Sequence, residues 1–486
     1  MNKLVKSVFC VAVLIAALYA ALNPLGYFSC RPQGDHAWAQ CDRASIALNY
    51  FQYSYPFFEP HTHNVAYNPS GIAAGEFPLV PFLVSKLYRY FGFHEYIYRL
   101  FTLFFSLVGF FTVFIISRIF LSRIIFQITA SVFWILSPNL IYYSTGFLPD
   151  SVSLSFFAIA VYFLIYQEVI TVKNILLFSL FSSIAVLLKS SVLFLIVAVG
   201  FAFLVTAYKR GESKRILFRA VFLIIPFLFC LSWIIYARHS QQLYHSNVFK
   251  LGLLLPNTFQ DLLDSGVRLA VNLPKFYPLP ILFLICFSLA FLVRNFQSAN
   301  FLHVFTLSAF AMWALFFVVM MRNASHHGYY HIPFQFAIST LFISVAGIAE
   351  QKKLNLRGIH FIATILFTFC SWSLYAVTIH KISSHQDFVN SPWKTLEPAL
   401  RNAGIRSTDK VFSAVDPSYN ISLYLMNQRG WTCPDKVWDS YKIDALNDCQ
   451  YAVFTDTTIA REPIIKKYLN TEIAAYDPLH IYKLKH

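Results

Sequence analysis

The strongest constraint on this chain is a series of eleven apolar stretches, each close to or above the length needed to cross a bilayer. A transmembrane helix takes about 17 to 25 residues, and lipid cannot satisfy backbone groups that a helix leaves unpaired. The sequence therefore predicts an all-α polytopic membrane protein with about eleven transmembrane helices. The predicted spans lie near 4–22, 97–121, 124–146, 151–167, 174–189, 190–208, 216–237, 277–294, 301–321, 330–349 and 358–379.

The composition agrees with lipid as the solvent. Hydrophobic residues make up 57% of the chain and charged residues 13%, whereas soluble domains carry about 25% charged residues. The net charge of +15 does not indicate nucleic acid, because the basic residues lie in short loops between apolar runs. Membrane lipids are the expected surroundings, and no nucleic-acid partner is expected.

Basic residues occur in every second loop, which is the pattern of cytoplasmic loops in membrane proteins. They predict a cytoplasmic N-terminus and, with an odd number of spans, an extracytoplasmic C-terminal region in a cell inner or plasma membrane. The segment 4–22 could also be a signal peptide, but its length and the lack of a small-x-small cleavage site favour an uncleaved first span. The basic residues are Arg118, Arg123, Lys173, Lys209, Arg210, Lys214, Arg215, Arg294, Lys352, Lys353 and Arg357.

Two regions are predicted. Residues 1–380 form the transmembrane domain, with a long outer loop at 23–96 that includes an amphipathic stretch from Phe77 to Phe91, and a second outer loop at 238–276. Residues 385–486 have the composition of a soluble domain. Strands near 410–415, 450–455 and 480–484 and helices near 418–427 and 459–469 predict a small α/β fold there.

The cysteines outside the spans form two pairs that are close in sequence. Cys30 and Cys41 lie in the first outer loop, and Cys433 and Cys449 lie in the C-terminal domain. In an oxidising compartment such pairs are candidates for disulfides. The alternative is that all are unpaired, since cysteine is often simply buried.

Ionisable and aromatic residues gather where outer loops meet spans. Such positions are costly unless the groups are solvated or paired, so they are functional candidates. Each also has a structural interpretation: Lys189 reaches the interface, Asp150 caps a helix, and the His and Tyr residues form an interfacial belt. The candidates are Asp35, His36, Asp42 and Arg43 after the first span, Glu76, Asp150, Lys189, and His326, His327, Tyr329, Tyr330 and His331.

Carboxylates beside a basic group at the lipid boundary suit a reaction on a lipid-anchored phosphate ester. A cation stabilises the departing phosphate, and a carboxylate takes a proton from the attacking hydroxyl. The three histidines of the outer loop before Pro333 lack the helical spacing of a metal site; they are His326, His327 and His331. The sequence leaves open whether a divalent metal is bound, and no cofactor is assigned.

Four features in order resemble the polyprenyl-phosphate-sugar-dependent glycosyltransferases of the C-type membrane fold, and more closely glycosyltransferase family 39, the protein O-mannosyltransferase and aminoarabinose transferase group. The resemblance covers about the first 200 residues, and the Tyr330-x-x-Pro333 loop and an outer C-terminal domain agree beyond them. The features are Asp35 with Ala44–Tyr50 after it, Glu76-Phe-Pro-Leu with Leu87–Gly92, Tyr98-Arg99-Leu100, and Ser137-Pro138 with Pro149-Asp150.

The resemblance implies an inverting glycosyltransferase that uses a polyprenyl-phosphate-linked sugar. Asp35 would be the general base, Lys189 would hold the donor phosphate, Arg99 would assist, and Asp150 would shape the site. Glu76, His327 and Tyr330 would bind substrate. The acceptor would be a hydroxyl of a lipid, glycan or protein.

The chain departs from the family in two places: His36 follows Asp35 where a second acid is common, and Glu76-Phe-Pro replaces Lys-Pro-Pro. These departures leave the sugar and any metal at Glu76 open. Two other classes compete, a transporter or flippase of lipid-linked sugars and a glycan polymerase or ligase that consumes a polyprenyl-diphosphate donor. A transporter would need polar residues deep within several spans, whereas here they lie at span ends.

Overall fold

The structure is a computed structural model of the chain. It describes residues 27–66, 70–135, 137–165, 171–210, 221–246, 249, 255–296, 300–352, 376–377, 380, 393–416, 418–454, 456–476 and 479–485. The predicted spans near 4–22 and 358–379 fall outside these residues, apart from 376–377. The described chain forms two compact units.

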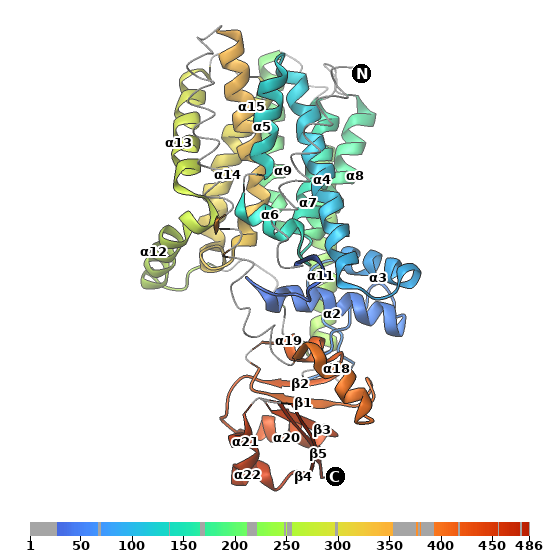
Figure 1. The fold of residues 1–486 in the computed structure, drawn as a ribbon. Helices are drawn as coiled ribbons and strands as arrows, with labels where there is room; N and C mark the ends of the chain where they lie inside the picture. The colour runs from blue at the N-terminus through green and yellow to red at the C-terminus, as the bar shows by residue number, and fades with distance from the viewer. Residues whose placement is uncertain are drawn as a thin grey trace. The chain divides into compact units, whose positions relative to one another are not determined.

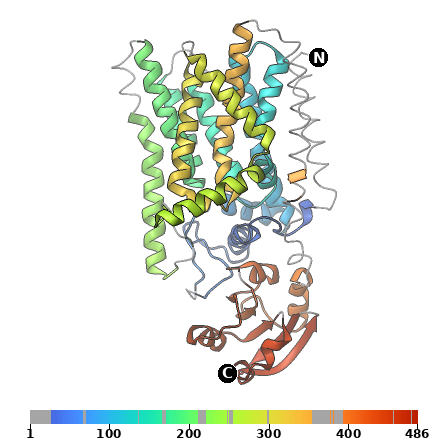
Figure 2. The same ribbon diagram turned by 90° about the vertical axis from the view of Figure 1, so that its left-hand side faces the viewer.

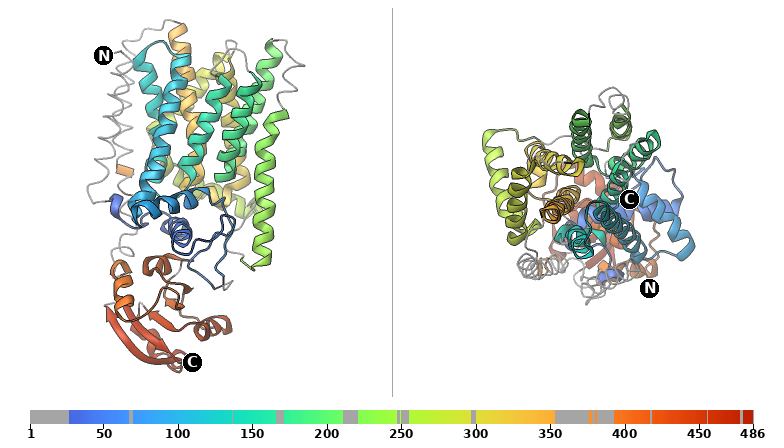
Figure 3. Two further views of the ribbon diagram at one scale, coloured as in Figure 1. Left: turned by 90° about the vertical axis from the view of Figure 1, so that its right-hand side faces the viewer. Right: turned by 90° about the horizontal axis from the view of Figure 1, so that it is seen from above.

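The first unit is helical and consists mainly of Arg99–Ile234 and Gly252–Lys381. Seen from above in Figure 3, many of its helices are viewed nearly end-on. Two helices, α4 and α11, begin in one unit and end in the other. The helices, labelled in Figure 1, are α4 (Glu95–Phe120), α5 (Ile124–Ile135), α6 (Pro138–Ser144), α7 (Asp150–Ile165), α8 (Val172–Leu188), η2 (Ser190–Val192), α9 (Leu193–Arg210), η3 (Val221–Ile224), α11 (Ile225–Leu243), α12 (Phe259–Phe276), α13 (Leu279–Arg294), α14 (Phe301–Ala324), η5 (Gly328–Phe334) and α15 (Gln335–Gln351).

The fold class predicted from the sequence is confirmed. Each predicted span that falls on described residues corresponds to a helix or to a pair of consecutive helices. By length and composition, five helical segments of the described chain could cross a membrane, or up to seven if each bent pair is one span. Helices α7 and α8 are apolar but shorter, and they pack side by side, with Ser153 Oγ donating to the Ala185 carbonyl at 2.7 Å.

The segment that the sequence analysis assigned to a second outer loop, 238–276, is largely helical. It holds the end of α11 and the whole of α12, which meets α13 at a bend of 101° and runs obliquely to its neighbours in Figure 2. Exposed apolar side chains recur at every fourth position of α12, at Phe259, Leu263, Val267 and Val271. This spacing places them on one face, so α12 is an amphipathic helix rather than a loop.

The second unit combines Ser29–Tyr98, Ile235–Leu251 and Ile382–His486. Helix α2 (Ala37–Tyr53) packs on α3 (Leu79–Phe91), visible in blue in Figure 3. Helix α3 occupies most of the predicted amphipathic stretch and turns Val80, Val84 and Tyr88 into the interior. These residues recur every fourth position, as expected for the buried stripe of a helix.

The C-terminal residues form a five-stranded sheet in the order β2-β1-β3-β5-β4. Strands β2, β1 and β3 are parallel, and β5 pairs antiparallel with β3 and β4. The small α/β fold is therefore confirmed. Its elements are α18 (Trp393–Asn402), β1 (Val411–Ala414), α19 (Ile421–Met426), β2 (Gly430–Cys433), α20 (Ser440–Asp448), β3 (Tyr451–Phe454), α21 (Thr457–Arg461), α22 (Pro463–Lys466), β4 (Leu469–Tyr476) and β5 (Leu479–Leu484).

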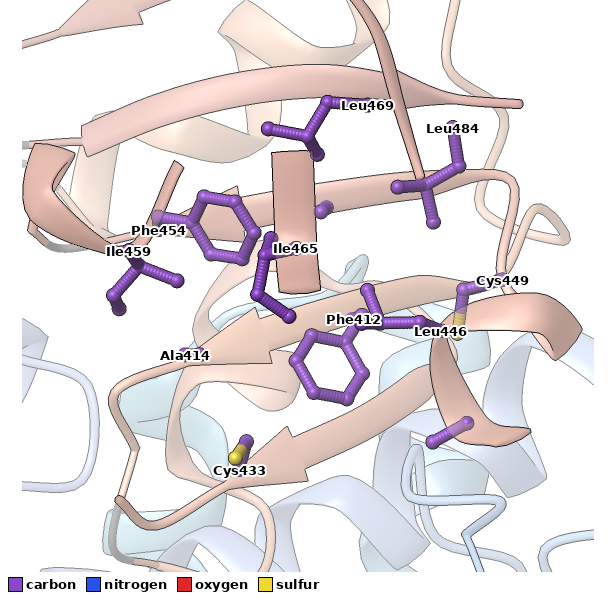
Figure 4. Close-up of a cluster of buried hydrophobic side chains, with 12 residues drawn as sticks. Phe412, Ala414, Cys433, Leu446, Cys449, Phe454, Ile459, Ile465, Leu469 and Leu484 are labelled. Atoms are coloured by element: carbon purple, nitrogen blue, oxygen red, sulfur yellow. The ribbon is translucent and has the colours of Figure 1, made fainter. Parts of the chain in front are cut away.

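The structure forms neither candidate disulfide, and Cys41, Cys433 and Cys449 are free thiols. Cys433 lies three residues beyond Gly430 and Cys449 two residues before Tyr451, while Gly430 and Tyr451 are both aligned with Val411. At about 3.3 Å per residue, the two cysteines are therefore about 16 Å apart along the strands, whereas a disulfide needs Cα atoms within about 7 Å. Figure 4 shows both as parts of the hydrophobic core around Phe412 and Leu446.

The candidate pair Cys30 and Cys41 is likewise not joined by a disulfide. Cys41 is fully buried within α2, whereas Cys30 comes before that helix and is half-buried. Cys41, Cys433 and Cys449 therefore fit the alternative interpretation, in which the cysteines are buried and form no disulfide.

Candidate functional site

Asp35, the predicted general base, lies in a tight turn just before α2. Gly34 and His36 both have positive φ, of 79° and 56°, and Ala37 N–H donates to the Gly34 carbonyl at 3.2 Å. The side-chain amide of Gln40 donates to the backbone carbonyl of Asp35 at 3.1 Å. The turn therefore holds the half-buried Asp35 side chain at the N-terminal end of the helix.

Seven residues after Asp35, Asp42 is buried with only 2% of its surface exposed. Its Oδ1 has no hydrogen-bond partner among the described residues. Burial raises the pKa of this carboxyl to about 7, against the opposing effect of Arg43. Asp42 belongs to the cluster of candidate residues after the first span, but no role could be predicted for it, because the sequence does not show which face of α2 is buried.

We expect Asp42 to make the protein less stable as pH rises. The folded pKa of about 7 lies above the unfolded value of 3.8, so the unfolded chain loses this proton first and stability falls between about pH 4 and 7. Asp42→Asn removes the ionisation, so its melting temperature should exceed that of wild type by a margin that grows over this range. Thermal unfolding of both proteins at pH 4, 6 and 8 measures it; a constant difference would contradict the assignment.

Arg43 forms an ion pair with Glu76, the second predicted acid of the outer loop. Its Nη2 and Nε lie 2.9 and 3.0 Å from Glu76 Oε2, and its guanidinium lies 5.1 Å from the centre of the Phe249 ring. Glu76 just precedes α3, so this pair ties the entrance of α3 to α2. The structure thus brings Glu76 to Arg43 on the same segment as Asp35.

In the first unit, Asp150 and Lys189 form a buried ion pair. Lys189 Nζ lies 3.1 Å from Asp150 Oδ1, and both side chains are almost fully buried. Asp150 begins α7 and Lys189 follows the end of α8; because α7 and α8 pack against each other, these two ends meet. Lys189 Nζ also lies 4.7 Å and 5.3 Å from the ring centres of Tyr329 and Tyr330, a geometry in which aromatic rings attract a cation.

His327 and Tyr330, two predicted substrate-binding residues, belong to the same cluster. The His327 ring stacks on Tyr329 with 5.4 Å between ring centres and an angle of 8°. The Tyr330 hydroxyl accepts a hydrogen bond from Asn323 at 3.2 Å. The structure therefore brings Asp150, Lys189, His327 and Tyr330 together, with Tyr329 at their centre.

Arg99 is fully buried and contacts the loop that leads to Asp150. Its Nη1 donates to the Thr145 carbonyl at 2.6 Å, and its guanidinium lies 4.7 Å from the centre of the Phe147 ring. Thr102, one turn further along α4, donates to the Gly146 carbonyl at 2.9 Å. These contacts fix the backbone just before Asp150, and the direct assistance that the resemblance implies for Arg99 stays a prediction.

Asn139 is a candidate that the sequence analysis missed. It is 1% exposed, and neither atom of its amide has a hydrogen-bond partner among the described residues. It lies against Gly328, where an added Cβ would stand 2.6 Å from Asn139 Oδ1, next to Tyr329. A buried amide without partners is costly, and a bound hydroxyl or phosphate would satisfy it.

Replacing Asn139 by leucine, which has a similar size, should therefore weaken binding of the lipid-linked donor that the resemblance implies, while leaving the fold intact. Removing an unsatisfied buried amide should also keep or raise the melting temperature. We expect an increase of about tenfold in the dissociation constant for the lipid donor, the effect of about one hydrogen bond. Unchanged donor affinity would show that Asn139 does not contact the donor.

Among the described residues, no group of three or more His, Cys, Asp or Glu side chains is arranged to hold a metal ion. Glu76 is engaged with Arg43, and His331 contacts the Ala324 carbonyl through Nε2 at 3.0 Å. The candidate residues described above supply carboxylates, a buried ammonium and aromatic rings.

Comparison with solved structures identifies the architecture. ArnT from Cupriavidus metallidurans in the apo state matches with a TM-score of 0.59 and 12% identity, over 98% of this chain and 97% of that one. ArnT bound to undecaprenyl phosphate matches with a TM-score of 0.57 and 12% identity, over 99% and 98%. This chain has the C-type glycosyltransferase fold.

A third match has the same fold in a larger protein. The arabinofuranosyltransferase AftD from Mycobacteria matches with a TM-score of 0.58 and 11% identity, over 98% of this chain but 40% of that chain. No protein-family model and no curated protein sequence matches. The chain thus shares the C-type fold with proteins to which its sequence is only 11 to 12% identical.

Proposed function

We propose that this chain is an inverting glycosyltransferase that moves a sugar from a polyprenyl-phosphate donor to an acceptor hydroxyl on the extracytoplasmic face of the membrane. The observation that carries the proposal is a buried, ring-flanked lysine, Lys189, inside a C-type fold. The Lys189 ammonium is already paired with the carboxylate of Asp150, and it can form a further charge-assisted hydrogen bond to a second anion. A lipid phosphate is such an anion, and a solved structure with the same fold contains undecaprenyl phosphate.

In this proposal Lys189 stabilises the negative charge of the donor phosphate. Asp150, 3.1 Å from its ammonium, positions it, and Arg99 in turn holds the loop before Asp150. Tyr330 and His327 line the same cluster. Because the cationic group is already in place, it needs no rearrangement as charge develops on the departing phosphate.

The reaction is a single displacement at the anomeric carbon. Asp35 accepts the proton of the acceptor hydroxyl, the acceptor oxygen forms the new glycosidic bond, and the bond from the anomeric carbon to the phosphate oxygen breaks. Polyprenyl phosphate leaves with the bonding electrons. Attack from the face opposite the phosphate inverts the anomeric configuration, as in inverting glycoside hydrolysis.

The orientation follows from the positive-inside pattern of the loops. It gives a cytoplasmic N-terminus and places Asp35 and residues 385–486 on the outer side. The acceptor is then a lipid, glycan or protein of the cell envelope.

Donor turnover by the purified protein in lipid nanodiscs tests the proposal. Polyprenyl-monophosphate sugars are supplied one at a time with an envelope extract, and a polyprenyl-diphosphate glycan serves as the competing donor. Release of polyprenyl phosphate from one monophosphate donor is the expected result. Turnover of the diphosphate donor alone would assign the chain to the polymerase or ligase class.

A further inference from the structure

The C-terminal domain contacts the segment that carries the candidate base through a continuous chain of hydrogen bonds. All the residues in this series of hydrogen bonds belong to the second unit. The series starts at Arg31, just before the Asp35 turn, passes through the C-terminal domain and returns to the middle of α2. Both of its ends therefore lie on the segment that contains Asp35 and Asp42.

The first half of the chain runs from Arg31 into the C-terminal domain. Arg31 Nη2 donates to Glu397 Oε2 at 3.3 Å, its Nε lies 3.1 Å from Glu95 Oε1, and its Nη1 donates to the Leu425 carbonyl. Glu397 Oε1 accepts from Asn427 Nδ2 at 2.7 Å. Arg31 is thus held by one acid from α4 and one from α18.

The second half runs from Asn427 back to α2 through His63. Asn427 Oδ1 lies 3.1 Å from His63 Nε2, and His63 Nδ1 lies 2.6 Å from Ser45 Oγ on α2. The His63 backbone N–H also donates to Ser45 Oγ at 3.0 Å. His63 is 1% exposed, so these bonds form away from water, where each is strong and an unmade one is costly.

The direction of every bond in the chain is fixed. A carboxylate only accepts, so Glu397 forces the Asn427 amide nitrogen toward itself and the amide oxygen toward His63. Nε2 of His63 must then carry the proton, which leaves Nδ1 to accept from the Ser45 hydroxyl. Burial lowers the pKa of His63 to about 4, which keeps the imidazole in this neutral form at neutral pH.

The backbone around His63 adds a second attachment. Gly430 N–H donates to the His63 carbonyl at 3.1 Å and Val65 N–H donates to the Gly430 carbonyl at 2.9 Å, so this loop pairs parallel with the edge of β2. A Cβ on Gly430 would stand 1.8 Å from the Val411 carbonyl oxygen, which explains glycine there. The loop thus covers the free edge of β2 in the manner of strand addition.

We infer that the C-terminal domain is a clamp that positions α2, with His63 and Asn427 as positioning residues for the base on that segment. The clamp fixes both the turn before α2 and the helix itself, and a base must be held within a fraction of an ångström of its working geometry. This role in catalysis rests on the proposed function. The mechanical role, holding α2, does not.

Asn427→Gly in the full-length protein tests the clamp. Asn427 has φ 46° and ψ 54°, a left-handed conformation that glycine adopts without strain, so the variant removes the amide while sparing the backbone. Glu397→Gln is the milder second variant, since it keeps the shape and removes the charge that orients Asn427. Lys436→Ala is the matched control, because it breaks the pair of Lys436 with Asp456 inside the same domain away from the chain of bonds.

Hydrogen exchange of the α2 amides in nanodiscs is the first readout. We expect exchange in Ala37–Tyr53 to accelerate by about tenfold in Asn427→Gly, the effect of about one buried hydrogen bond, and to stay at the wild-type rate in Lys436→Ala. The second readout is kinetic: kcat should fall and the KM for the donor should stay constant, because the clamp acts on the base and not on donor binding. Wild-type exchange of α2 in both Asn427→Gly and Glu397→Gln would overturn the clamp.

The mechanical role of the clamp and its role in catalysis can be contradicted by different results. Faster α2 exchange in a protein whose wild type turns over no polyprenyl-phosphate sugar would uphold the clamp and reject the proposed function. Faster exchange with an unchanged kcat, in a protein that does transfer sugar, would show that the clamp is structural only and overturn its catalytic role.

Discussion

Asp35→Asn is expected to lower the rate of sugar transfer by about 10² to 10⁴-fold, the usual contribution of a general base. The amide keeps the shape of the side chain but cannot accept the acceptor proton. Because the turn is held by the Asp35 carbonyl and by Gly34, not by the carboxylate alone, the fold should survive. Transfer rates and melting temperature measured on the same preparation check both parts.

Asp42→Asn is the matched variant for this experiment, since it makes the same chemical change about two helical turns away on the same segment. The account expects it to retain transfer activity and to gain stability at neutral pH. The opposite pattern, with Asp42→Asn inactive and Asp35→Asn active, would move the role of base to Asp42. Its pKa of about 7 suits a base at neutral pH, and kcat/KM would then fall as pH drops below 7.

The second large effect is expected at the buried ion pair. Lys189→Met removes the cation that pairs with the buried carboxylate of Asp150, and breaking a buried ion pair on one side should cost about 3 to 5 kcal/mol of stability. In the double variant, Asp150→Asn also removes the negative charge that has lost its partner. The double variant should therefore recover most of the lost stability. Thermal unfolding of the single and double variants measures this part.

Donor binding separates the structural role of Lys189 from its functional role. If Lys189 holds the donor phosphate, the stable double variant should still bind polyprenyl phosphate at least about tenfold more weakly than wild type, because a charge-assisted hydrogen bond contributes about 1.5 to 3 kcal/mol. Recovery of both stability and binding in the double variant would show that the pair is structural only.

The membrane-spanning architecture could be predicted because long apolar runs leave few alternatives. The sequence was less informative about α12, whose apolar residues are spaced at every fourth position among polar ones and fall below the hydropathy of a span. Strands β2 and β4 were missed for a different reason. β2 has the sequence Gly-Trp-Thr-Cys and lacks the valine that β1 and β3, strands of the same length, contain. Most of β4 is exposed, so it does not show the alternation that marks a half-buried strand.

The candidate site was predicted in part for similar physical reasons. Asp150, Lys189 and Tyr330 lie at the ends of apolar segments, where a polar residue stands out in the sequence, and the structure brings them together. Asn139 lies inside a short helix after Pro138 and could be recognised only from its burial. His63 could not be assigned a role from sequence either, because its partner Asn427 is 364 residues away.

Cysteine pairing shows the limit of sequence proximity. Cys433 and Cys449 are close in sequence, but they lie at the two ends of the connection that joins β2 to β3 through helix α20. Because both strands run parallel to β1, this connection starts at one end of the sheet and finishes at the other. Parallel strands must be joined by such a crossover. Proximity in sequence is therefore a poor guide to pairing within a parallel sheet.

The most direct test of the central claim is the fate of the anomeric carbon in one round of transfer. A polyprenyl-phosphate sugar that the protein consumes is prepared with ¹³C at that carbon, and the lipid product and the glycosylated acceptor are examined by mass spectrometry and NMR. The account predicts polyprenyl monophosphate as the lipid product and an inverted configuration in the acceptor, with neither formed by Asp35→Asn. Retention of configuration, or passage of the intact labelled lipid across the membrane without cleavage, would contradict it.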